Sequence, residues 1–321
     1  MTSNEIKSCI LDKFDMDFVG IADVKYLQNE EPGHRPTDLL PTAKNVIVFG
    51  RKMIDGAVQG CFRALEDHIS AAQSSYAAFV NEQGPNFLLV SVTNNICRYL
   101  EDECGAVAMP LTFGNLQNMV WEKYPAPLFV DPYGQGMPLD LAKAAVAAGL
   151  GEIAWNNRFV TEKYGPRQIL CAVITDMDIE CDEPYSGAKL CDPEKCGICS
   201  EVCPTKAIPS KSCGAGKTVC IGSCTCEKAD INVGACVVAS LGMRREFSGR
   251  VPCPDLVMTD TPTDEELIEA FKVKPLNQAA IDHYPKYLCE RCLMFCPLGN
   301  WQKNFADRNF TSYGKETEGT V

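Results

Sequence analysis

The chain has 321 residues, of which 46% are hydrophobic and 19 are cysteines, and its formal net charge at pH 7 is −12. This length allows one large or two ordinary domains with a sizeable core. The acidic balance disfavours nucleic acid as a partner, because contacts to a phosphate backbone need a basic surface. The first residues lack an apolar signal core, and no apolar run approaches the ~18 residues that cross a bilayer. We therefore expect a cytoplasmic location and no membrane partner.

The first 180 residues alternate between short apolar runs and amphipathic segments, which predicts a mixed α/β fold. Four apolar runs predict strands: Val19–Ala22, Asn45–Gly50, Leu128–Asp131 and Cys171–Thr175. Apolar residues at intervals of three and four predict helices over 65–79 and 89–100. A further helix is expected from Pro138 to Ala148, because proline suits a first helical turn and Gly149 suits the exit.

Two cysteine runs in the second half share one spacing. Cys196 to Pro204 and Cys289 to Pro297 both read C-x2-C-x3-C-P. In bacterial ferredoxins this rhythm wraps a [4Fe-4S] cube, and the last cysteine of each run reaches the other cube. Structural zinc knuckles are the alternative, since C-x2-C pairs also hold zinc, but the proline after each final cysteine favours clusters. The spacing therefore predicts two [4Fe-4S] clusters.

Two cubes need eight thiolates, and the ferredoxin pattern distributes them between the runs. The first cluster would take Cys191, Cys196, Cys199 and Cys296. Cys191 stands in for the usual first cysteine, whose place is occupied by Pro193, and Cys181 is its reserve. The second cluster would take Cys203, Cys289, Cys292 and one further thiol, for which Cys236 and Cys253 are the candidates.

Four more cysteines lie in a glycine-rich insertion at 211–227: Cys213, Cys220, Cys224 and Cys226. They could hold a third metal site, a cluster or a zinc ion, or be surplus thiols in a loop. Five isolated cysteines are expected to behave as small buried hydrophobes: Cys9, Cys61, Cys97, Cys104 and Cys171. The domain boundaries then fall at 1–180 for an α/β domain, 181–306 for a cluster domain containing the insertion, and 307–321 for a polar tail. A helix near Thr263 to Phe271 begins with a capping box of Thr263 and Glu266.

Several segments, in order along the chain, resemble the family of epoxyqueuosine reductases and reductive dehalogenases. They are Phe18–Ala22, Leu39–Val48, Ala147–Glu152 (A-A-G-L-G-E), Tyr164–Arg167 (Y-G-P-R), Val173–Asp176 and Ile231–Cys236. The last of these is similar to the family segment that donates a lone cysteine between the runs. The resemblance therefore places Cys236, ahead of Cys253, on the second cluster.

The resemblance implies an N-terminal corrinoid-binding-like domain that holds base-off cobalamin, and a C-terminal ferredoxin-like domain that supplies electrons. It implies corrinoid contacts from Gly149, Leu150, Gly151, Tyr164 and Arg167. Val130-Asp131 matches a family segment that carries the proton donor, although the loop 133–136 is inserted after it. Asp131 and Tyr133 are therefore both candidate catalytic acids. Ala154-Trp155 stands where epoxyqueuosine reductases have Gly-Lys, which suggests a different substrate.

We therefore expect an oxidoreductase that passes electrons from two [4Fe-4S] clusters to cobalamin and cleaves a bond in a small-molecule substrate. A low-potential ferredoxin or flavodoxin would be its electron donor. The first alternative is an electron-transfer protein that reduces the corrinoid of a partner and binds none itself. The second is a binding module in which the metal is structural.

Overall fold

The computed structural model describes residues 1–67, 88–112, 139–240, 244, 257, 259, 261–273 and 289–299. The fold is mixed α/β, as predicted. At its centre lies a four-stranded sheet of β1 (Phe18–Asp23), β2 (Asn45–Lys52), β3 (Ala108–Thr112) and β6 (Gln168–Thr175). The strand order is β1-β2-β6-β3, and every neighbouring pair is antiparallel. Three of the predicted strands are thereby confirmed; the fourth, Leu128–Asp131, lies outside the described residues.

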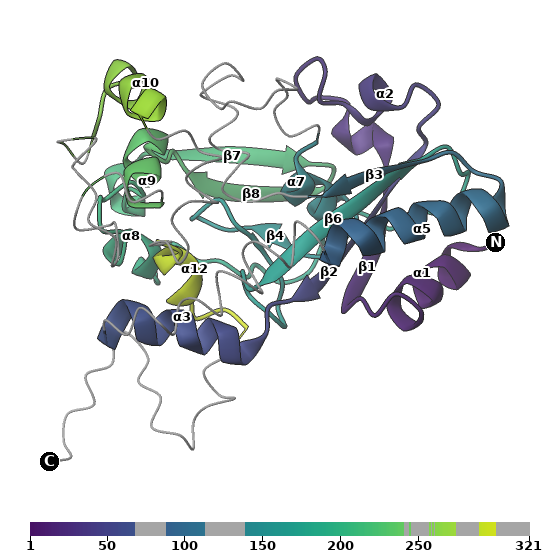
Figure 1. The fold of residues 1–321 in the computed structure, drawn as a ribbon, viewed down its shortest axis with the longest axis horizontal. Helices are drawn as coiled ribbons and strands as arrows, with labels where there is room; N and C mark the ends of the chain where they lie inside the picture. Colours follow the sequence, from purple (N-terminus) through teal and green to yellow (C-terminus); the bar gives the residue numbers. More distant parts are fainter. Residues whose placement is uncertain are drawn as a thin grey trace, which may run out of the picture.

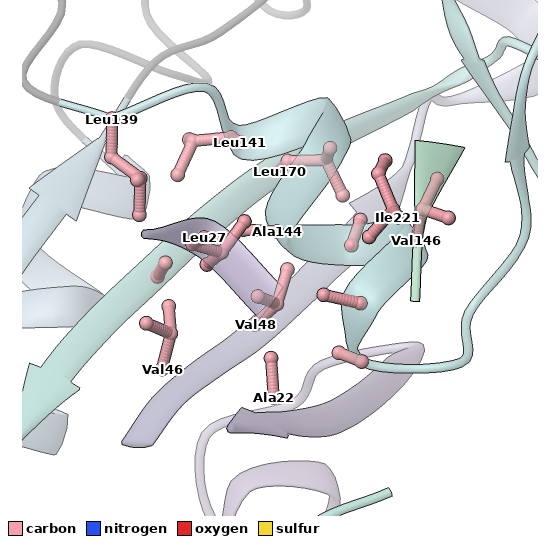
Figure 2. Packing of buried hydrophobic residues seen from close by; sticks show 14 of the residues in the cluster. Ala22, Leu27, Val46, Val48, Leu139, Leu141, Ala144, Val146, Leu170 and Ile221 are labelled. Atoms are coloured by element: carbon pink, nitrogen blue, oxygen red, sulfur yellow. The ribbon is translucent and has the colours of Figure 1, made fainter. Parts of the chain in front are cut away.

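Helices cover both faces of this sheet (Figure 1). Successive side chains of a strand point to opposite faces, so Ile47 and Phe49 of β2 pack against α1 (Ser3–Asp12) and α5 (Leu89–Cys104). Val46 and Val48 face the other way and pack beneath α7 (Leu141–Ala147), where Figure 2 shows the buried side chains. Because the two middle strands are buried on both faces, their apolar runs are continuous rather than alternating.

The position of α7 is fixed at both ends by capping. The helix begins after Asp140, whose carboxylate accepts hydrogen bonds from the backbone N–H groups of Ala142 and Lys143. The predicted start at Pro138 is not used. At the other end Gly149 has φ +74°, a left-handed conformation that glycine adopts without a steric penalty, so the predicted exit is confirmed.

The cysteine-rich half adds short elements at one end of the sheet. A first hairpin joins β4 (Glu152–Ile153) and β5 (Phe159–Val160), and a second joins β7 (Gly216–Ile221) and β8 (Cys224–Ala229). The remaining helices are α2 (Pro36–Leu39), α3 (Asp55–Asp67), α8 (Ile198–Glu201), α9 (Val233–Ser240), α10 (Asp264–Val273), α12 (Arg291–Met294) and the 3-10 turns Val24–Leu27 and Lys211–Cys213. Figure 1 shows α8, α9, α12 and α3 near one another, at the end of the molecule away from α1.

Two further helix predictions have clear outcomes. The helix expected over 89–100 is confirmed as α5, and the one near Thr263 as α10, with Thr263 and Glu266 forming the predicted capping box. Of the helix expected over 65–79, the structure describes only residues 65–67, and these form the end of α3. The rest of this prediction lies outside the described residues. Within the part of the chain that the structure describes, no helix has both the length and the apolar character to cross a membrane.

Candidate metal centre

The first group of cysteines draws its members from both runs. Cys199, the second residue of α8, lies close enough to four other thiols for their charges to act on it: Cys292, Cys191, Cys296 and Cys196, of which Cys292 belongs to the second group described below. The thiol of Cys296 is likewise influenced by Cys191 and Cys196. The structure therefore brings together the four cysteines that the spacing assigned to one cluster, and the last member comes from the distant run.

The second group lies around a pocket, called the cavity below. Cys203, Cys236, Cys289 and Cys292 all line it, and the charges of the first two and of Cys292 act on Cys289. Cys203 follows α8, Cys236 sits on α9, and the other two flank the start of α12. This is again the predicted set, with the final cysteine of the first run placed among the thiols of the second.

Burial raises the pKa of five thiols in the two groups. Desolvation raises the pKa of Cys296 to about 12, and it is also the main cause of the raised pKa values of Cys191, Cys199, Cys289 and Cys292. An anionic sulfur without a counter-charge is therefore disfavoured here. Because metal binding requires thiolates and releases their protons, such a pocket favours a cationic guest over bare thiolates.

Among the described residues no three His, Cys, Asp or Glu side chains converge tightly enough to hold a single metal ion. Every described cysteine is a free thiol.

The tip of the β4–β5 hairpin organises the first group. The backbone N–H of Trp155 donates to Cys191 Sγ (3.4 Å), and the indole N–H of Trp155 donates to the carbonyl of Pro209 (2.8 Å). The buried carboxylate of Glu152 accepts hydrogen bonds from the backbone N–H groups of Leu190 (3.0 Å) and Cys191. The cysteine spacing gave no indication of these two residues, although Glu152 closes the A-A-G-L-G-E segment.

The same hairpin tip reaches the second group through polar side chains. The amide Nδ2 of Asn156 donates to the carbonyl of Cys292 (2.9 Å). The guanidinium of Arg158 forms an ion pair with Glu290 (3.2 Å), and both residues line the cavity. No local pattern in the sequence marks these three residues, because they meet across more than 130 positions of the chain.

The Y-G-P-R segment fastens the second run to the sheet. The guanidinium of Arg167 donates to the carbonyls of Leu293 and Cys296 (3.0 Å each), and also to that of Leu298. Gly165, with φ +57°, lies so close that an added Cβ would collide with the Leu298 carbonyl. Tyr164 donates its backbone N–H to Thr161 Oγ1 (3.1 Å) and its hydroxyl to Asp17 (3.4 Å). Arg167 therefore has a definite structural task at the cysteine run.

The other residues predicted to contact a corrinoid also take part in internal packing. A Cβ on Gly149 would lie 2.8 Å from the carbonyl of Glu183, and one on Gly151 would collide with the carbonyl of Val160. Leu150 packs against the core beneath α7. The candidate acids Asp131 and Tyr133, and the alternative ligand Cys253, lie outside the described residues. Corrinoid contact stays a prediction for all of these positions.

The third metal site is not supported, and the insertion at 211–227 is an ordered β-hairpin. Cys224 and Cys226 lie on its buried face, with their sulfurs 3.7 Å apart and Cys226 Sγ accepting from the Ile153 N–H (3.3 Å). Cys220 pairs with Thr225 and therefore points to the opposite, exposed face, and Cys213 is also exposed. The four thiols cannot surround one guest, because the alternation of the strand divides them.

The isolated cysteines have the expected surroundings. Cys9, Cys61, Cys97 and Cys171 are buried, while Cys104 is half-buried beside Met1. Cys181, the reserve ligand, accepts a hydrogen bond from Asn45 Nδ2 (2.8 Å) and packs on the α1 and α5 side of the sheet. It is therefore engaged away from both thiol groups.

Known proteins share part of this sequence. Tetrachloroethene reductive dehalogenases of Desulfitobacterium hafniense and Dehalobacter restrictus are 38% identical over 66 residues, which is 20% of this chain and 12% of those proteins. An epoxyqueuosine reductase of Lactococcus garvieae is 38% identical over 73 residues, 23% of this chain and 19% of that protein. Over these stretches the chain is similar to reductive dehalogenases and epoxyqueuosine reductases. This confirms the resemblance read from the sequence.

The matched segments are short, and no protein-family model matches the chain. Among solved structures, an epoxyqueuosine reductase with a tRNA stem loop has a TM-score of 0.49 at 17% identity, covering 92% of this chain and 65% of that one. A reductive dehalogenase described with B12-dependent dehalogenation has a TM-score of 0.39 at 17% identity, covering 87% and 36%. The chain therefore spans well under half of that dehalogenase.

Proposed function

We propose that this chain is an iron-sulfur oxidoreductase that holds two [4Fe-4S] clusters in its two thiol groups. The first would be bound by Cys191, Cys196, Cys199 and Cys296, and the second by Cys203, Cys236, Cys289 and Cys292. One observation carries the proposal: Cys203 lies with the second run, and Cys296 lies with the first. This exchange of final cysteines is the ferredoxin arrangement, and sequence-local zinc sites would not require it.

The residues around the groups suit such a guest. The backbone N–H of Trp155 points at Cys191 and that of Ala207 at Cys203 (3.2 Å), so each would stabilise a thiolate by a hydrogen bond. Trp155, Ala207 and Ile208 also form a buried apolar wall, which keeps water from the thiols packed against it, whereas Cys196 is exposed. When bound, clusters of this type accept and pass on single electrons. The chain's own contribution is to position the sulfurs and to exclude solvent.

We further propose that residues 1–180 form a corrinoid-binding-like domain and residues 181–306 a ferredoxin-like domain. A bound cobalamin would supply a reducing cobalt centre for cleaving a carbon-oxygen or carbon-halogen bond in a small molecule. This part rests on the relatives. No described side chain among the five predicted corrinoid contacts is held ready for a ligand, since Tyr164 and Arg167 are engaged within the chain. Asp131 and Tyr133 remain the proposed acids.

That internal engagement favours a second candidate, an electron-transfer protein without a corrinoid of its own. It would take electrons from a ferredoxin or flavodoxin and reduce a partner that carries the cobalamin. Both candidates are consistent with a cytoplasmic location. A relative has been solved with a tRNA stem loop, so a tRNA is the alternative substrate to test, against the expectation from the net charge of −12.

Metal counting after anaerobic purification tests these proposals. The reductase requires about eight irons and one cobalt per chain after incubation with cobalamin, and the electron-transfer protein requires about eight irons without cobalt. Zinc in place of iron would overturn both. Gel-shift titration with a tRNA stem loop at two salt concentrations decides the nucleic-acid alternative, since phosphate contacts weaken as salt rises.

A further inference from the structure

A buried ion pair lies at the edge of the second thiol group. The guanidinium Nη2 of Arg158 is 3.2 Å from Glu290 Oε1, and the two side chains are only 5% and 9% exposed. Removing two charges from water is costly unless they are paired and well placed. Both residues line the same cavity as the four cysteines. Because burying these two charges is costly, stability alone does not explain why they lie beside a group of thiols.

Strong local constraints hold this pair in place. Arg158 follows the tip of the β4–β5 hairpin, where its backbone N–H donates to Asn156 Oδ1 (3.2 Å) and its carbonyl accepts from the Ala154 N–H (2.9 Å). Glu290 stands directly before α12 with φ +38°, a conformation that costs energy for a residue other than glycine. Such strain persists only where the surroundings enforce it. The geometry of the pair is therefore set by both elements.

Arg158 and Glu290 share the lining of one pocket with Cys292. The side chain of Asn156, two residues before Arg158, donates to the carbonyl of Cys292 (2.9 Å) and so holds the hairpin tip against this cysteine. The reduction potential of an iron-sulfur cluster depends on hydrogen bonds to its sulfurs, on nearby charge and on exposure to solvent. A cationic donor next to a ligand sulfur stabilises the extra electron of the reduced state.

We propose that Arg158 raises the reduction potential of the cluster in the second thiol group and that Glu290 moderates this effect. The proposal rests on the proposed function, because it assumes that Cys203, Cys236, Cys289 and Cys292 bind a cluster. Arg158 is a positioning residue in this role: it acts through Cys292. The two charges have opposite effects on the reduction potential. Neutralising Arg158 should lower it, and neutralising Glu290 should raise it.

The test is a mediator-coupled titration with dithionite, which supplies one electron per cluster, followed by electron paramagnetic resonance. Arg158→Gln should lower the midpoint potential of one cluster and Glu290→Gln should raise that of the same cluster. A unit charge acting over roughly 10 Å at an effective dielectric of about 20 changes the reduction equilibrium on the order of tenfold, or ~59 mV. Arg158→Lys, which keeps the charge, should fall between the wild type and Arg158→Gln.

Two controls sharpen the assignment. Cys292→Ser identifies the affected cluster, because the signal that this variant loses should be the one that Arg158→Gln shifts. Arg51 lies on β2 and forms a surface ion pair with Asp15. Arg51→Gln removes this pair and should leave both potentials unchanged. Unchanged potentials in the Arg158 and Glu290 variants, or shifts of the same sign, would overturn the proposal.

Iron content distinguishes a failure of the proposed function from a failure of the role proposed for Arg158. If the wild-type chain binds no iron, the proposed function itself is wrong, and the role of Arg158 is wrong with it. If the wild type binds about eight irons and the potentials do not move, only the role of Arg158 fails. Should Arg158→Gln lose iron because Glu290 is left buried without its cation, Glu290→Gln and Arg158→Lys decide the question by the sign and size of their shifts.

Discussion

The guanidinium Nη1 of Arg167 donates a 3.0 Å hydrogen bond to the carbonyl oxygen of Cys296. Arg167 stands directly before β6, and Cys296 ends the second cysteine run, so this bond joins the central sheet to the thiols. The same guanidinium also reaches the carbonyls of Leu293 and Leu298. One buried side chain therefore fixes the backbone of the whole turn after α12.

We expect Arg167→Lys to loosen this turn, because an ammonium cannot reproduce a planar fork of donors. Losing one charged hydrogen bond costs about 1.5–3 kcal/mol, so the free energy of unfolding in urea should fall by on the order of 2 kcal/mol. Iron per chain after gel filtration should fall with it. Lys163→Ala, which removes only an ammonium lying 5.0 Å from the ring centroid of Tyr164, should preserve both. Wild-type iron and stability in Arg167→Lys would contradict this structural task.

Close packing at Gly151 leads to a second prediction. A Cβ there would collide with the carbonyl of Val160, which belongs to the strand paired with Glu152. Gly151→Ala should therefore displace the β4–β5 hairpin and destabilise the fold by about 1–3 kcal/mol. Gly56→Ala is the matched control: its Cβ meets nothing within 4 Å in α3. There alanine should be neutral or stabilise by up to ~1 kcal/mol. Equal unfolding midpoints for the two variants would refute the contact.

Iron counting across cysteine variants tests the ligand assignment and the correction to the insertion. Cys292→Ser should lose about four of about eight irons and one paramagnetic signal, while the other signal persists. Cys220→Ser should keep the full iron content, because its side chain points away from Cys224 and Cys226 on the other face of the hairpin. Loss of iron from Cys220→Ser would restore a metal site in the insertion. Unchanged spectra in Cys292→Ser would remove that residue from the ligands.

Alkylation should distinguish buried thiols from exposed ones. Burial raises the pKa of Cys171 and of Cys97 to about 12, and only the thiolate reacts, so at pH 8 roughly one such thiol in ten thousand is ionised. Iodoacetamide should therefore leave both unmodified in the folded protein, whereas the exposed Cys213 and Cys220 are labelled. Peptide mass spectrometry measures the extent at each site. Rapid labelling of Cys171 before unfolding would contradict its place in the sheet.

The raised pKa of Cys171 also affects the free energy of unfolding at high pH. The folded-state pKa of Cys171 is raised from 9.0 to about 12 by desolvation. The unfolded chain therefore releases this proton first, and the stability that the neutral thiol contributes is complete below about pH 9 and is lost as pH rises towards 12. Cys171→Ala should flatten the decline in unfolding free energy between pH 9 and 11, measured by urea titration. An unaltered slope would place the ionisation elsewhere.

The local sequence was sufficient for the regular elements. The uninterrupted apolar runs at β2 and β6 predict strands buried on both faces, and the periodicity of α5 and the capping box of α10 predict helices. These signals work because hydrogen bonding and side-chain periodicity operate within a few residues. The helix α7 begins at Leu141 rather than near Pro138, because the side chain of Asp140 caps it.

Sequence spacing also determined which cysteines gather, since a C-x2-C-x3-C-P run has few ways to arrange its sulfurs around a cube. It could not reveal what holds them. Trp155, Arg158 and Arg167 meet the cysteine runs across long stretches of chain, and only the folded structure brings them together. Composition could not show which thiols of the insertion are buried. In the folded hairpin, β8 buries Cys224 and Cys226 on one face, and Cys220, which pairs with Thr225, lies on the exposed face. Spacing along the chain is a local property, whereas the charge and hydrogen bonds around a sulfur depend on tertiary contacts.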